Sequence, residues 1–152
     1  MVIKMKTKTH YIAKLFIDAL LILCIVGVVT IPFWMRAYQG WLRYDDTVFY
    51  PMMVIVGLSG ALAAFILFTL DRMYKTLTSG DPFVQANVTA FRRISVTCAV
   101  IAVLYIIKCF MVFSLATVIV VLIFIGGTLF CYTLKDLFAR AVEYKEENDL
   151  TI

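Results

Sequence analysis

Long apolar stretches alternate with shorter polar segments along this chain. Four apolar stretches, at about 11–35, 51–75, 94–113 and 115–138, are separated by short polar segments. Each is long enough to cross a hydrocarbon core of about 30 Å as an α-helix. The pattern predicts an all-α polytopic membrane protein, with one domain over residues 1–152 and four transmembrane helices in two hairpins. The last helix is expected to continue into a cytoplasmic tail at 139–152 with an apolar stripe on one side.

The polar segment Asp71–Arg93 divides the two hairpins. Ser79-Gly80 is a helix-breaking pair, and the Asp81-Pro82 pair after it is typical of a helix start. Asp at the N-cap accepts a bond from an unpaired backbone N–H, and Pro at the first helical position lacks an N–H that has no partner there. We therefore expect a short cytoplasmic amphipathic helix from Pro82, lying near the lipid headgroups and leading into the third span.

Composition agrees with a membrane protein, and the distribution of basic residues sets its orientation. Hydrophobic residues make up 63% of the 152 positions, more than a soluble domain of this size needs. Basic residues concentrate in alternate segments, so the positive-inside rule places the N-terminus, the central segment and the C-terminus in the cytoplasm. This charge indicates topology and anionic lipid contact, with no direct nucleic-acid binding. The concentrated groups are Lys4, Lys6, Lys8 and Lys14; Arg72, Lys75, Arg92 and Arg93; and Lys135, Arg140 and Lys145.

Residues that carry chemistry are sparse. The chain has one histidine, His10, and no glycine-rich phosphate loop. Its four cysteines lie in or beside the spans without a C-x-x-C pair, which is typical of small packing residues rather than metal ligands. Nucleophilic catalysis needs a base beside the nucleophile. We therefore expect no enzymatic activity, no metal and no cofactor.

Asp18 and Lys108 are the charged residues within the predicted spans that are candidates for a role inside the membrane. Asp18 lies about two turns into the first span, and Lys14, one turn earlier, is within reach as a structural ion pair. The alternative is a functional contact of Asp18 with another cation. Lys108 lies in the outer third of the third span, where its ammonium group can reach the outer headgroups. The alternative is a role in an ion or proton pathway.

Small residues mark one face of the second span. Gly57, Ala61 and Ala64 recur at helical spacing, with Gly60 one turn from Ala64. Small residues let two helix backbones approach closely, which favours association inside lipid. This face is expected to pack within the bundle, and the shorter patch of Cys24 and Gly27 in the first span is a candidate partner. Such faces also permit a homo-oligomer.

Two polar motifs resemble a known family. They are G-D-P-F-V-x-x-N-V-x-x-F-R-R-I at Gly80–Ile94 and L-K-D-L-F-x-x-A-V-E-Y-K-E-E-N-D-L-T-I at Leu134–Ile152. They are similar to the bacterial family called domain of unknown function 2975, and the resemblance covers nearly the whole chain. The family implies a four-span protein of the bacterial inner membrane without assigned activity. Its genes commonly neighbour a small helix-turn-helix regulator, which implies, by association, control of a cytosolic transcription regulator.

Three hypotheses follow for function. In the first, the chain is a regulatory partner that holds or releases the cytosolic regulator through the central segment and the tail. The alternative is a small transporter, channel subunit or immunity-type protein that binds an apolar or peptide ligand between the helices, for which Asp18 and Lys108 are the candidate residues. In the third, the two cytoplasmic segments pack on each other and rigidify the bundle. The candidate partner-binding residues are Asp81, Phe83, Asn87, Arg92, Arg93, Tyr144, Asn148, Asp149 and Ile152.

Overall fold

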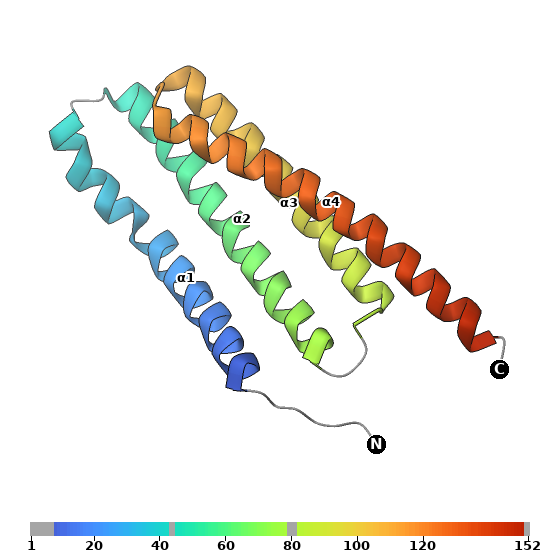
Figure 1. Ribbon diagram of the computed structural model, residues 1–152. Coiled ribbons are helices and arrows are strands. Elements are labelled where there is room, and N and C mark those ends of the chain that lie inside the picture. Colours follow the sequence, from blue (N-terminus) through green and yellow to red (C-terminus); the bar gives the residue numbers. More distant parts are fainter. Residues whose placement is uncertain (1–7, 43–44, 79–81, 151–152) are drawn as a thin grey trace.

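Four long helices form the computed structural model (Figure 1). The structure describes the chain except residues 1–7, 43–44, 79–81 and 151–152. The helices are α1 (Lys8–Leu42), α2 (Asp46–Thr78), α3 (Gln85–Met111) and α4 (Leu115–Leu150). No strand occurs in the described residues, so the prediction of four apolar helices is confirmed.

The helices have the length and the surface of membrane spans. Candidate spans within them run over Tyr11–Ala37, Asp46–Thr78, Gln85–Met111 and Leu115–Asn148. Large apolar side chains are exposed around the whole molecule, among them Phe33 at 75% and Phe110 at 88%. A soluble protein rarely exposes apolar patches beyond a few hundred Å². This surface is that of a multi-pass membrane protein surrounded by lipid.

The helices extend beyond the apolar stretches from which they were predicted. Most of the first connection is helical, because α1 continues to Leu42 and α2 already begins at Asp46. The Asp45 carbonyl accepts the backbone N–H groups of Val48 and Phe49 at 3.0 Å, which starts α2 before Pro51. Pro51 then lies inside the helix rather than at its beginning. The short turn expected near Ser114 is present between α3 and α4.

Packing follows chain order. α1 contacts α2, α2 contacts α3 and α3 contacts α4, with the most extensive packing in the last pair. Figure 1 shows successive helices running in opposite directions, so that the start of α1, the α2–α3 connection and the end of α4 lie at one end of the molecule. We call this end the connection end. Among the described residues, α1 has no packing partner other than α2.

Small and polar residues join α3 to α4. The Ser95 hydroxyl donates to the Thr128 carbonyl at 2.9 Å, and a Cβ on Gly127 would lie 3.6 Å from the sulfur of Cys98. Ile101 and Ala102 are buried beside these contacts. Interhelical hydrogen bonds and close backbone approach are the forces that join helices in lipid.

The α1–α2 contact depends on Gly60 rather than on the full small-residue face. A Cβ on Gly60 would lie 2.7 Å from Val28 Cγ2, and the Cys24 thiol donates to the Gly60 carbonyl at 3.7 Å. Of the candidate patch in the first span, Cys24 therefore contacts this face. A Cβ on Gly57 would meet nothing within 4 Å, and the same holds for Gly27. Only one glycine on this face is required for close approach.

This difference predicts unequal effects of the same substitution at two neighbouring glycines. Gly60→Val should lower the stability of the chain in detergent by about 1–3 kcal/mol, because a β-branched side chain overlaps the stiff Val28. Gly57→Val, one turn earlier, is the matched control and should change stability little. Thermal unfolding measures both, and Val28→Ala should restore part of the loss in Gly60→Val. Equal effects of the two valines would contradict the assignment.

Candidate functional site

Asn87 joins three parts of the chain at the connection end. Its Nδ2 donates to the Pro82 carbonyl at 2.7 Å, and its Oδ1 accepts the Thr76 hydroxyl at 2.8 Å. Thr76 belongs to the last turns of α2, Pro82 to the connection and Asn87 to the first turn of α3. The Thr76 hydroxyl also lies 2.7 Å from the Met73 carbonyl and 3.4 Å from the Arg72 carbonyl, so its single hydrogen is shared among three acceptors. Asn87 is only 1% exposed. Both the oxygen and the nitrogen of this buried amide have hydrogen-bond partners.

The prediction that the helix starts at Pro82 is wrong. α3 begins at Gln85, and Val84 is extended with φ −123° and ψ 146° and provides no side-chain cap. The Asn87 N–H bonds to the Val84 carbonyl at 2.9 Å, which is the first turn of the helix. Because the Asn87 side chain donates a hydrogen bond to the Pro82 carbonyl, residues 82–84 are held outside the helix. The expected separate amphipathic segment is instead the beginning of a continuous α3, and Asp81 lies outside the described residues.

Three aromatic rings join the connection and α3 to α4. The Phe138 ring lies 4.9 Å from Phe91 and 5.7 Å from Phe83, measured between centroids. Phe91 is buried, whereas Phe83 remains 42% exposed. Val142, one turn after Phe138, is also buried at 6% exposure. We call Phe83, Phe91 and Phe138 the aromatic joint. It brings the two motifs of the central segment and the tail into direct contact.

A buried carboxylate, that of Asp71, lies on the side of α2 that faces α1. Asp71 is 7% exposed, and its Oδ2 pairs with Lys75 Nζ at 2.7 Å. Its Oδ1 is buried without a hydrogen-bond partner. Asp71 follows Gly60 by about three helical turns and therefore lies on the face of α2 that meets α1. One oxygen of the carboxylate is thus paired, and the other is buried without a partner.

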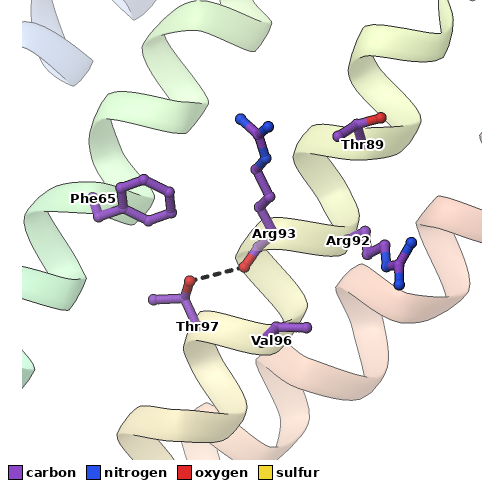
Figure 2. Close-up of a pocket in the computed structure, with 6 residues that line it drawn as sticks. All are labelled: Phe65, Thr89, Arg92, Arg93, Val96 and Thr97. Carbon is purple, nitrogen blue, oxygen red and sulfur yellow. Dashed lines mark hydrogen bonds between the residues drawn. The ribbon is translucent and has the colours of Figure 1, made fainter.

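Arg92 and Arg93 line an open recess between α2 and α3. The recess has a volume of about 360 Å³ and is lined by Phe65, Thr89, Arg92, Arg93, Val96 and Thr97. Figure 2 shows the Arg93 side chain between the two helices, directed toward the end of α3 that carries Thr89, with Phe65 across from it. Arg92 extends to the other side of α3 in this view. Both arginines are exposed.

The tail presents exposed side chains beyond the aromatic joint. Tyr144 is 71% exposed, and Asn148 is also exposed in the last turns of α4. Asp149 lies in the helix, but its side chain, like all of Ile152, falls outside the described part of the chain. Of the predicted partner-binding residues, the structure therefore brings Phe83 onto α4, buries Asn87, and leaves Tyr144 and Asn148 at the surface.

Asp18 and Lys108, the charged residues proposed to act within the membrane, lie apart from this site. Asp18 is half-buried and Lys14 exposed, and no ion pair joins them. The expected pair is therefore absent. Lys108 is half-buried near the end of α3, with its ammonium 5.3 Å from the centre of the Tyr105 ring. No group of three or more His, Cys, Asp or Glu side chains gathers to hold a metal ion within the described ranges.

Residues 42–152 match the family model described as "Protein of unknown function (DUF2975)". The chain belongs to this family. No curated protein and no solved structure shows significant similarity to it. The match includes the aromatic joint, the Asn87 contacts and the arginine recess, but it begins at the last residue of α1. The family resemblance is therefore shorter than the nearly full-length one expected from the motifs.

Sequence reasoning missed three features of this site. The Asp71–Lys75 pair has the i, i+4 spacing of helical ion pairs and was available from the sequence. Phe138 lies at the end of the fourth predicted stretch, but nothing in the sequence indicated its partners. The bond between Thr76 and Asn87 has no sequence signal, because it depends on how α2 and α3 approach.

We expect the Asn87 amide to contribute strongly to stability. Asn87→Asp keeps the shape but removes the donor and places a carboxylate oxygen against the Pro82 carbonyl. The loss should be about 1–3 kcal/mol, the cost of an unsatisfied buried polar group. Gln85→Ala, at an exposed position two residues earlier, is the control. Thermal unfolding and amide hydrogen exchange of residues 82–88 measure the effect, and an Asn87→Asp protein as stable as the control would refute it.

The aromatic joint makes a second prediction. Phe138→Ala should lower stability by about 1–3 kcal/mol, because two ring pairs are lost at once. Phe130→Ala is the matched control, since Phe130 lies on the same helix at 64% exposure. The measurement is thermal unfolding in detergent, together with hydrogen exchange at Phe83. Equal behaviour of the two variants would show that the joint contributes nothing to stability.

Proposed function

We propose that this protein is an integral membrane docking partner, with both termini and the connection end in the cytoplasm. Its binding surface would consist of the exposed edge of the aromatic joint, Phe83, and the exposed tail residues Tyr144 and Asn148. Its ligand would be a cytosolic helix-turn-helix regulator, the partner that the family resemblance implies. The connection end carries the basic segments that favour a cytoplasmic location.

One observation carries this proposal: Phe83 packs on Phe138 at 5.7 Å and still exposes 42% of its surface. Two segments that are distant in the sequence therefore form one surface with a fixed backbone on both sides. Exposed aromatic residues next to a rigid support are the side chains that dominate protein–protein binding energy. Tyr144 lies six residues beyond Phe138 on α4 and is 71% exposed, so a partner at this end of the helix can reach it.

The proposal predicts that the tail is needed for partner capture but not for membrane insertion. Crosslinking in native membranes, followed by mass spectrometry, should capture a small helix-turn-helix protein with the full chain. Tyr144→Ala and truncation after Glu143, which removes both Tyr144 and Asn148, should each reduce that capture at least about tenfold, the effect of losing a binding hot spot. Tyr11→Ala is the matched control, because Tyr11 is 74% exposed in the first turn of α1, which begins at the connection end.

The other outcomes separate the remaining hypotheses. Equal capture by all four proteins would remove the tail from the binding surface. A lower melting temperature of the truncated chain, with capture unchanged, would assign the tail a structural role. If no cytosolic protein is captured by any variant, the docking proposal fails, and a ligand or transport role involving Asp18 or Lys108 takes its place.

A further inference from the structure

The recess at Arg92 and Arg93 lies on the lipid-facing side of the molecule, although it carries two cationic side chains. Phe65 is 44% exposed on its α2 side, and Val96 is 59% exposed on its α3 side. In a membrane these two apolar side chains contact lipid. The recess therefore combines an apolar lining with a guanidinium group. A water-filled site does not need the apolar lining, and a lipid-facing surface does not need the charge.

The two arginines have no counter-charge within the described residues. No carboxylate lies at ion-pair distance from either guanidinium, and none lines the recess. The neighbouring hydroxyl groups donate internally: Thr97 to the Arg93 carbonyl at 2.8 Å, and Thr89 to the Gln85 carbonyl at 3.1 Å. The guanidinium groups are thus the donors that remain for an external anion.

The depth of Arg93 suits a lipid phosphate. Arg93 lies eight residues into α3, about 12 Å along the helix from Gln85. Its side chain is directed back toward that end (Figure 2), which is the direction in which a cationic side chain reaches the headgroup layer. An acyl chain of the same lipid would run the other way, along Phe65 and Val96. Arginine binds phosphate through parallel N–H bonds, which makes this contact stronger than a diffuse attraction.

From this geometry we propose that the α2–α3 recess binds one anionic glycerophospholipid, with its phosphate on Arg93 and an acyl chain along Phe65 and Val96. Arg92 also lines the recess, but its side chain extends to the other side of α3, so Arg93 is the residue that meets the phosphate. A headgroup with a cationic choline is disfavoured beside an unpaired guanidinium group, so the ligand class is anionic. This site is separate from the proposed docking surface and does not depend on it.

Native mass spectrometry of the full-length protein in dodecyl maltoside tests the proposal, with equal amounts of phosphatidylglycerol and phosphatidylcholine added. The wild-type chain should retain one phosphatidylglycerol in preference to phosphatidylcholine. Arg93→Gln should weaken that retention about tenfold, the effect of losing one charged hydrogen-bonding group. Val96→Trp should weaken it as well, because the indole fills the apolar floor while both arginines remain. Since Val96 is exposed, this variant separates lipid binding from folding.

Arg140→Gln is the matched control, because Arg140 is also exposed and lies on α4 outside the recess. Its retention of phosphatidylglycerol should equal that of the wild type. Equal losses in Arg93→Gln and Arg140→Gln would overturn the site in favour of a diffuse charge effect. Equal retention of the two lipids would overturn the anionic class. Displacement of phosphatidylglycerol by millimolar inorganic phosphate would identify a free anion rather than a lipid as the ligand.

Discussion

The bonds of one buried amide determine how the connection end is built. Asn87 is held between the Thr76 hydroxyl and the Pro82 carbonyl, so α2, the connection and α3 meet at a single side chain. A buried primary amide without partners is costly, and here both of its polar atoms are satisfied. The same bonds hold residues 82–84 outside the helix, and the Phe83 ring there packs on Phe138 of α4. The aromatic joint therefore depends on a polar contact one helical turn away.

Packing divides the molecule into a tight part and a peripheral helix. α3 and α4 share a hydrogen bond from Ser95 to the Thr128 carbonyl and a close approach at Gly127, whereas α1 meets only α2. The family match over residues 42–152 covers α2, α3 and α4, the helices that carry the Asn87 contacts and the aromatic joint. α1 is attached to this unit through Gly60, where the missing side chain admits Val28. Apart from this close approach α1 packs along α2, and among the described residues it contacts neither α3 nor α4.

The apolar pattern predicted the four helices because a span must satisfy its backbone internally and be long enough to cross the membrane. It could not predict which face of each helix meets another helix, since lipid tails are as apolar as the neighbouring side chains. Gly60 and Gly57 therefore looked equivalent in sequence, although only Gly60 is in close contact. The Asp81-Pro82 pair had the composition of a helix start, but a tertiary bond from Asn87 overrode this local preference. Polar contacts between helices require the arrangement of the helices, which the sequence pattern does not contain.

The recess and the aromatic joint lie on the same helix, and this has a consequence for the spacing of α2 and α3. Phe91 packs on Phe138, while the next two residues are the arginines that line the recess. A ligand shifts a conformational equilibrium only as far as its affinities for the two states differ. A lipid that contacts Phe65 on α2 and Arg93 on α3 binds best when those helices keep the spacing that the Asn87 amide also requires. A lipid in the recess would therefore favour the same α2–α3 spacing as the Asn87 bonds, so the two contacts would support one arrangement of these helices.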